Sequence, residues 1–87
     1  MTQPLAGKQI LIVEDEPVFR SLMHTWLASL GATIVQAEDG MDALQKMAES
    51  KPDLMICDIS MPRMNGLQLV EHVRNQGEQL PILMISA

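Results

Sequence analysis

The chain has 87 residues, of which 47% are hydrophobic, with a formal net charge of −5 and a single cysteine. This length allows one domain with a modest core, and one cysteine excludes an internal disulfide framework. The acidic balance, without a Lys/Arg cluster, argues against direct nucleic-acid binding, and no apolar run reaches the ~20 residues of a membrane span. Because the N-terminus also lacks the apolar region of a signal peptide, we expect one domain over residues 1–87, in a reducing cytoplasm.

Strand-like and helix-like segments alternate along the chain. Short β-branched, apolar runs favour strands, whereas apolar residues recurring at i, i+4 and i+8 favour helices. Strands are predicted at 9–14, 33–37 (an edge strand), 53–59 and 82–85, and helices at 17–30, 41–49 and 67–76. The helices begin at Pro17, after Asp39 and after Asn65, the last with Gln68 in a capping box, and Gly31 ends the first. This order predicts an α/β fold with a parallel sheet.

Each predicted helix carries apolar residues that we expect to face the core. In the first helix these are Val18, Phe19, Leu22, Met23, Trp26, Leu27 and Leu30; in the second, Ala43, Leu44, Met47 and Ala48; in the third, Leu69, Val70 and Val73. His24 and His72 lie on predicted helix surfaces without metal-ligand spacing, so we expect both to be solvated. Cys57 lies inside an apolar strand, which predicts a buried, inert thiol.

Carboxylates stand directly at the ends of two predicted strands. Glu14 and Asp15 follow the apolar run 9–13, and Asp58 follows the run 54–57. Open α/β sheets bind ligands at the carboxyl ends of their strands, so these three side chains are predicted to lie together. At ~4 Å and an effective dielectric near 20, each like-charge pair costs about 4 kcal/mol. Such a cluster favours a divalent cation that prefers oxygen ligands.

The predicted site allows phosphoryl chemistry. Asp58 is a natural nucleophile or phosphoacceptor, with a cation held beside it by Glu14 and Asp15 and by the backbone carbonyl of Ser60. Ser86, at the end of the last strand, offers a hydroxyl to a phosphoryl oxygen. Alone, the acidic run 14–16 is equally well a solvated first helical turn, and Asp58 alone is equally well a turn cap. Their combination at strand ends favours a site.

Five segments match a known family in order and at its spacing. They are Ile10–Pro17, Ala37–Gly40 followed by Ala43 and Leu44, Pro52–Pro62, Asn65–Gly66, and Pro81–Ala87. Together they cover nearly the whole chain, which resembles the receiver domain of two-component response regulators. The resemblance implies a flavodoxin-like open parallel sheet with strand order 2-1-3-4. It also implies that the domain is regulatory and not an enzyme.

The resemblance also implies roles for individual residues. Asp58 would accept a phosphoryl group from a histidine kinase or a small phosphodonor. Asp15, Asp58 and the Ser60 carbonyl would bind Mg²⁺ directly, and Glu14 would act through the water shell of the ion. Ser86 would be the switch hydroxyl, and Met61, Pro62 and Gly66 would shape the adjoining loop. Within the family, segments 1–10 and 57–66 most resemble the receiver of an adaptor that delivers a stationary-phase sigma factor to proteolysis, which implies a sigma factor or anti-adaptor proteins as partners of the full-length protein.

The chain departs from the family at its end. A receiver continues with a helix, a strand and a last helix, and a lysine that contacts the phosphate stands on that strand. None of Lys8, Lys46 and Lys51 stands at the corresponding strand end, so the resemblance implies a truncated receiver. An exposed fourth strand also favours an alternative, a module that dimerises or binds a partner independently of phosphorylation.

Two enzyme or cofactor classes fit less well. A phosphatase or phosphotransferase with an aspartyl intermediate needs a second acid two residues after the nucleophile, where Ser60 stands. A dinucleotide-binding domain needs a glycine-rich turn after the first strand, where the sequence has Glu14–Pro17.

Overall fold

One parallel sheet organises the chain. The computed structural model describes residues 3–61 and 64–85. Its strands are β1 (Gln9–Val13), β2 (Thr33–Ala37), β3 (Leu54–Asp58) and β4 (Ile82–Ile85), in the order β2-β1-β3-β4. Its helices are α1 (Pro17–Ser29), α2 (Gly40–Glu49) and α3 (Gly66–Asn75). The predicted α/β fold and strand order 2-1-3-4 are confirmed, with β2 at one edge.

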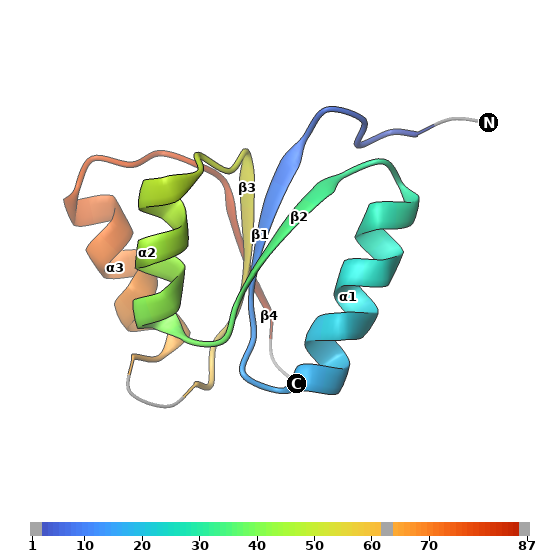
Figure 1. Ribbon diagram of the computed structural model, residues 1–87. Helices are drawn as coiled ribbons and strands as arrows, with labels where there is room; N and C mark the ends of the chain where they lie inside the picture. Colours follow the sequence, from blue (N-terminus) through green and yellow to red (C-terminus); the bar gives the residue numbers. More distant parts are fainter. Residues whose placement is uncertain (1–2, 62–63, 86–87) are drawn as a thin grey trace.

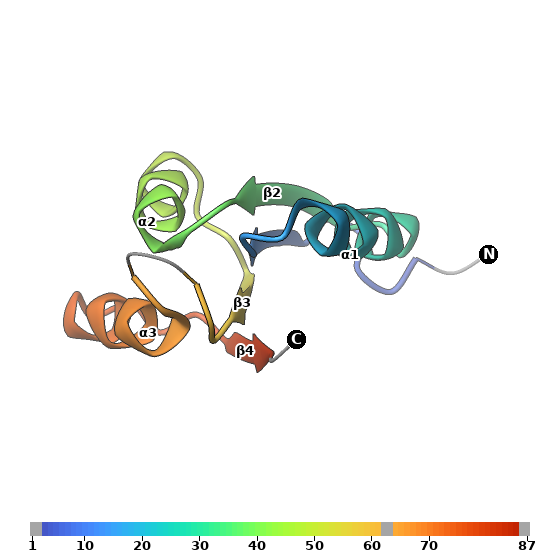
Figure 2. The ribbon, with the colours of Figure 1, turned by 90° about the horizontal axis from the view of Figure 1, so that it is seen from below.

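The helices cover both faces of the sheet. Figures 1 and 2 show α1 on one face, and α2 and α3 on the other. Successive residues of a strand point to opposite faces, so Ile10 and Ile12 join the core beneath α1, while Leu11 and Val13 join the core beneath α2 and α3. Burial on both faces explains why β1 and β3 read as unbroken apolar runs.

The carboxyl ends of the strands meet the N-terminal ends of the helices at one edge, the lower edge in Figure 1. Side chains cap each helix there. Glu16 accepts a hydrogen bond from the amide of Phe19 at 2.8 Å, and Asp39 accepts one from Asp42 at 2.8 Å. Asn65 and Gln68 form the predicted reciprocal capping box. These caps fix where the loops of this edge begin and end.

The predicted buried face of α1 is only half right. Leu27 is buried and Phe19, Met23 and Leu30 are partly buried, whereas Val18, Leu22 and Trp26 are 66%, 62% and 62% exposed. At 100° per residue the seven apolar side chains span about half the circumference of the helix, and a helix on a flat sheet buries a narrower stripe. α1 packs on β1 and β2, and these three side chains are the part of its apolar face that stays mostly exposed. We call Val18, Leu22 and Trp26 the outer row of α1.

Two smaller features complete the fold. Ala48 of α2 is exposed, contrary to prediction, because Ala43, Leu44 and Met47 occupy the side of the helix that meets the core. Among the described residues, no helix combines the length and the apolar character needed to cross a bilayer.

Candidate functional site

The structure brings the three predicted carboxylates together. Glu14 follows the last residue of β1, Asp58 is the last residue of β3, and these strands are neighbours in the sheet. One carboxylate oxygen from each of Glu14, Asp15 and Asp58 lies within 4.8 Å of the other two. Glu14 and Asp58 are 1% and 4% exposed, whereas Asp15 is open to solvent. The cluster therefore has a buried side, formed by Glu14 and Asp58, and an accessible side, formed by Asp15.

The loop after β3 holds Asp58 in place. The amide of Ser60 donates a hydrogen bond to Oδ1 of Asp58 at 3.2 Å, and the amide of Gly66 donates to the carbonyl of Ile59 at 2.9 Å. Ser60 is exposed beside the cluster, and Met61 is buried in the core beneath α2 and α3. Pro62 and Ser86, the latter predicted as the switch hydroxyl, lie outside the described residues.

Glu14 is the electrostatically unusual member of the cluster. Burial raises the pKa of its carboxyl from 4.5 to about 7, against the lowering effect of the Glu16 amide, and the carboxyls of Asp15 and Asp58 raise it further. Oε2 of Glu14 accepts a hydrogen bond from that Glu16 amide at 3.1 Å, but Oε1 is buried and has no hydrogen-bond partner within residues 3–61 and 64–85. A buried carboxylate oxygen that lacks a partner there, on a side chain clustered with two further carboxylates, fits a bound cation.

A polar network beside the cluster was not anticipated from the sequence. Arg20, on α1, donates to the backbone carbonyl of Glu14 and to the side chain of Gln36 on β2. Gln36 in turn contacts His24, which is half-buried and hydrogen-bonded and not solvated as predicted. One feature of the sequence could have indicated this network. Arg20 and His24 lie four residues apart, on one side of a helix whose inner side is otherwise apolar.

Cys57 lies next to Asp58 but has no place in the chemistry. It is fully buried, and burial, together with the nearby Asp58 and Glu14 carboxylates, raises the pKa of its thiol to about 12. This agrees with the predicted inert thiol, because the thiolate is the reactive form.

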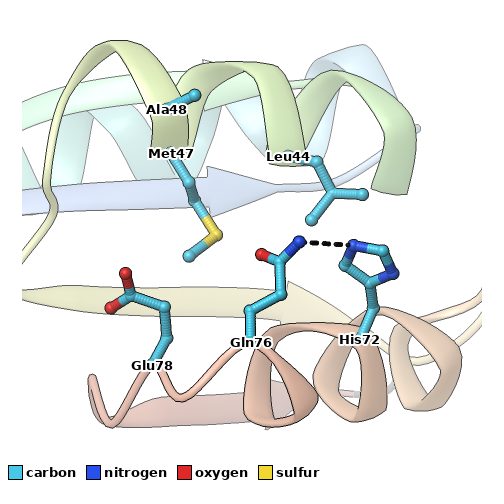
Figure 3. Close-up of a pocket in the computed structure, with 6 residues that line it drawn as sticks. All are labelled: Leu44, Met47, Ala48, His72, Gln76 and Glu78. Carbon is cyan, nitrogen blue, oxygen red and sulfur yellow. Dashed lines mark hydrogen bonds between the residues drawn. The ribbon is translucent and has the colours of Figure 1, made fainter.

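A depression also lies between α2 and α3, with a volume of about 210 Å³. Figure 3 shows Leu44 and Met47 of α2 pointing toward His72, Gln76 and Glu78, and Ala48 also lines the depression. His72 and Gln76 are joined by a hydrogen bond of 3.1 Å. None of the clustered carboxylates lines the depression, so it is separate from the acidic site.

The fold and the acidic edge agree with a family-level match. Residues 10–87 match the model of the response regulator receiver domain. The chain belongs to this receiver family. Its match to the family begins within β1 and includes every residue of the acidic cluster.

Known receivers and regulators show how far the likeness extends. The chain is 69% identical to the Regulator of RpoS of Escherichia coli over 87 residues, which is all of this chain and 26% of that protein. It is 37% identical over 79 residues to the response regulator MprA of Mycobacterium ulcerans, covering 91% of this chain and 34% of that one. The chain thus spans 26% to 34% of the length of these curated relatives.

Solved structures give the same architecture. The response regulator TrrA of Thermotoga maritima, in complex with Mg²⁺-BeF, superposes with a TM-score of 0.87 at 38% identity, covering 92% of this chain and 70% of that one. The receiver domain of the Francisella response regulator 1452 gives a TM-score of 0.89 at 25% identity, covering 93% and 67%.

Proposed function

We propose that this receiver is a phosphorylation-dependent signalling domain in which Asp58 is the phosphoacceptor and Mg²⁺ is the cofactor. The observation that carries the proposal is the cluster of Glu14, Asp15 and Asp58, with carboxylate oxygens within 4.8 Å of one another at the carboxyl edge of the sheet. A response regulator with the same fold binds Mg²⁺-BeF. This supports the same ligand class for the present chain.

The residues of the cluster suit a hard cation. Asp15, Asp58 and the carbonyl of Ser60 would hold Mg²⁺ directly, and Glu14 would accept hydrogen bonds from its water shell. The partnerless Oε1 of Glu14 favours this assignment, because water bound to a cation would satisfy it. When bound, the ion supplies positive charge that offsets the cluster and the incoming phosphoryl oxygens.

Asp58 supplies the nucleophile. A carboxylate oxygen attacks phosphorus, an acyl phosphate forms, and the bond from phosphorus to the histidine nitrogen of a kinase, or to the oxygen of a small phosphodonor, breaks with its electron pair on the leaving group. The Ser60 amide, which donates to Oδ1, orients the carboxylate. The chain acts in this scheme as an acceptor and not as an enzyme, and Ser86 would bind the phosphoryl group as the switch hydroxyl.

Labelling with acetyl phosphate and Mg²⁺, followed by intact mass measurement, tests the assignment. The wild-type chain should gain one phosphoryl group, and Asp58→Asn should gain none. Asp53→Asn is the matched control, because Asp53 precedes the same strand and instead accepts a hydrogen bond from Gln9 at 2.8 Å. Labelling of Asp58→Asn at the wild-type rate would identify another acceptor.

A relative supports a second proposal, on the output of the complete protein. Because the chain is 69% identical to a regulator of RpoS, we propose that the full-length protein is an adaptor that delivers a stationary-phase sigma factor to proteolysis, under the control of phosphorylation and of anti-adaptor proteins. Retention of RpoS by the immobilised full-length protein, with and without beryllofluoride, tests this. Equal lack of retention in both conditions would contradict it.

A second candidate is self-association through β4, independent of phosphorylation. Leu83, in the middle of this edge strand, is 53% exposed, and an edge strand offers unpaired backbone groups to another chain. Light scattering at increasing concentration should show dimers that Leu83→Glu reduces. Met41→Glu, at a 55% exposed side chain on α2, is the control. A constant monomer mass would exclude this candidate.

A further inference from the structure

A chain of three polar side chains runs from α1 across β2 to the acidic site. Nη1 of Arg20 donates to the backbone carbonyl of Glu14 at 2.7 Å, and Nε of Arg20 donates to Oε1 of Gln36 at 3.2 Å. The amide nitrogen of Gln36 contacts Nδ1 of His24. All three side chains are half-buried, so these contacts are shielded from water.

The donors and acceptors define a direction for this chain of contacts. Arginine only donates, so the oxygen of the Gln36 amide must face it. The amide NH₂ of Gln36 is thereby directed at Nδ1 of His24, which accepts. His24 therefore orients Gln36, and Gln36 orients the guanidinium of Arg20. A guanidinium held at two nitrogens has little freedom to move away from the carbonyl it binds.

Arg20 completes the fixation of Glu14. The amide of Glu14 donates to the carbonyl of Ala37 at 3.0 Å, and its Oε2 accepts from the amide of Glu16 at 3.1 Å. With the carbonyl bound by Arg20, Glu14 is held at three points, and in the part of the chain that the structure describes its Oε1 is the one oxygen without a protein partner.

We propose that Arg20 is a positioning residue for the cation site, acting on Glu14 through its backbone carbonyl and oriented by Gln36 and His24. This inference rests on the proposed function, because it assigns Arg20 to the Mg²⁺ site proposed above. Binding to the carbonyl places a cation next to the cluster while leaving the carboxylate oxygens free for the metal. A guanidinium bound to the carboxylates would instead compete with it.

A positioning role and a purely electrostatic role of Arg20 predict opposite changes in Mg²⁺ affinity for Arg20→Gln. Removing a positive charge near the carboxylates, with geometry unchanged, would strengthen Mg²⁺ binding. Loss of positioning weakens it, by roughly 10- to 100-fold, as for other residues that orient metal ligands. Isothermal titration calorimetry with Mg²⁺ alone separates the two signs. Arg20→Lys, which keeps one donor for the carbonyl, should recover part of the affinity.

Arg74→Gln is the matched control. Arg74 also donates through Nη1 to a backbone carbonyl, that of Glu78 at 3.0 Å, but lies on α3 away from the cluster. The Arg74→Gln variant has the same change in charge as Arg20→Gln and should leave the Mg²⁺ affinity within about twofold of wild type. Gln36→Met, which retains Arg20 but removes its side-chain support, should weaken Mg²⁺ binding less than Arg20→Gln does.

The outcomes separate this inference from the proposed function. If wild type binds Mg²⁺ and Arg20→Gln binds it as well or better, the positioning role is refuted and the proposed function stands. If wild type neither binds Mg²⁺ nor accepts a phosphoryl group, both are refuted. If Arg20→Gln fails to fold, Arg20→Lys and Gln36→Met provide the test. If both variants bind Mg²⁺ as tightly as the Arg74→Gln control does, the positioning role is refuted.

Discussion

Gly66 packs directly against the backbone of Asp58. A Cβ atom built at residue 66 would lie 2.4 Å from the carbonyl oxygen of Asp58 and 2.9 Å from Cα of Ile59. The first residue of α3 thus approaches the end of β3 more closely than any side chain allows. The absence of a side chain at position 66 lets the loop between them close next to the acidic cluster.

Gly66→Ala should therefore destabilise the chain. Alanine favours a helix by up to about 1 kcal/mol over glycine, but overlap with a backbone oxygen costs about 1–3 kcal/mol, and we expect the overlap to dominate. Urea unfolding measures the difference. Gly40→Ala is the comparison, because the three atoms nearest to its Cβ, from 2.8 Å, belong to the side chain of Met64 and none of them to the backbone. A Gly66→Ala variant as stable as wild type would contradict the close packing.

Glu14 should make the stability of the chain depend on pH. The unfolded chain loses this proton near pH 4.5, and the folded chain near pH 7. Over this interval the folded state binds more protons, so the free energy of unfolding falls as the pH rises, by roughly 3 kcal/mol in total from this group. Above pH 7 the loss is complete, and added Mg²⁺ should reverse part of it.

Urea unfolding at pH 5 and pH 8 measures this effect. Glu14→Gln stays neutral and should lose less stability than wild type between the two pH values. Glu71→Gln, at an exposed position of α3, should behave as wild type does. An identical pH dependence in wild type and Glu14→Gln would show that Glu14 is not the group responsible.

Truncation of two adjacent residues of α1 should affect stability to very different extents. Leu27 is 4% exposed and Trp26 is 62% exposed. Leu27→Ala should lower the free energy of unfolding by about 2–5 kcal/mol through loss of burial and a cavity, whereas Trp26→Ala should change it by less than ~0.5 kcal/mol. Thermal or urea unfolding measures both. A large loss in Trp26→Ala would reveal that another surface covers the outer row of α1.

Cys57 should be unreactive in the folded chain. With burial raising the pKa of its thiol to about 12, labelling by a thiolate-specific reagent at pH 8 should be roughly 100-fold or more slower than in the urea-unfolded chain. Absorbance of the released chromophore measures the rate. Comparable rates in the two states would mean that the β3 strand opens readily.

Local patterns were enough to predict most of the fold. Unbroken apolar runs predicted β1 and β3, the spacing of apolar residues predicted three helices, and the element order predicted a parallel sheet. The acidic residues at the strand ends were predicted to meet, and Glu14, Asp15 and Asp58 do meet, because parallel strands end at a common edge. These properties depend on periodicity and chain direction, which the sequence determines by itself.

Packing between elements determines which side chains of a pattern are buried. Leu22 and Met23 are equally apolar, but α1 presents one to solvent and the other to the sheet, according to which strands it covers. Glu14 and Asp15 are adjacent carboxylates, yet Glu14 is buried and Asp15 exposed, because the amide of Glu14 still bonds to Ala37 at the end of β2, whereas Asp15 lies in the loop beyond. The contact of Arg20 with the Glu14 carbonyl joins two elements, and no local pattern encodes it.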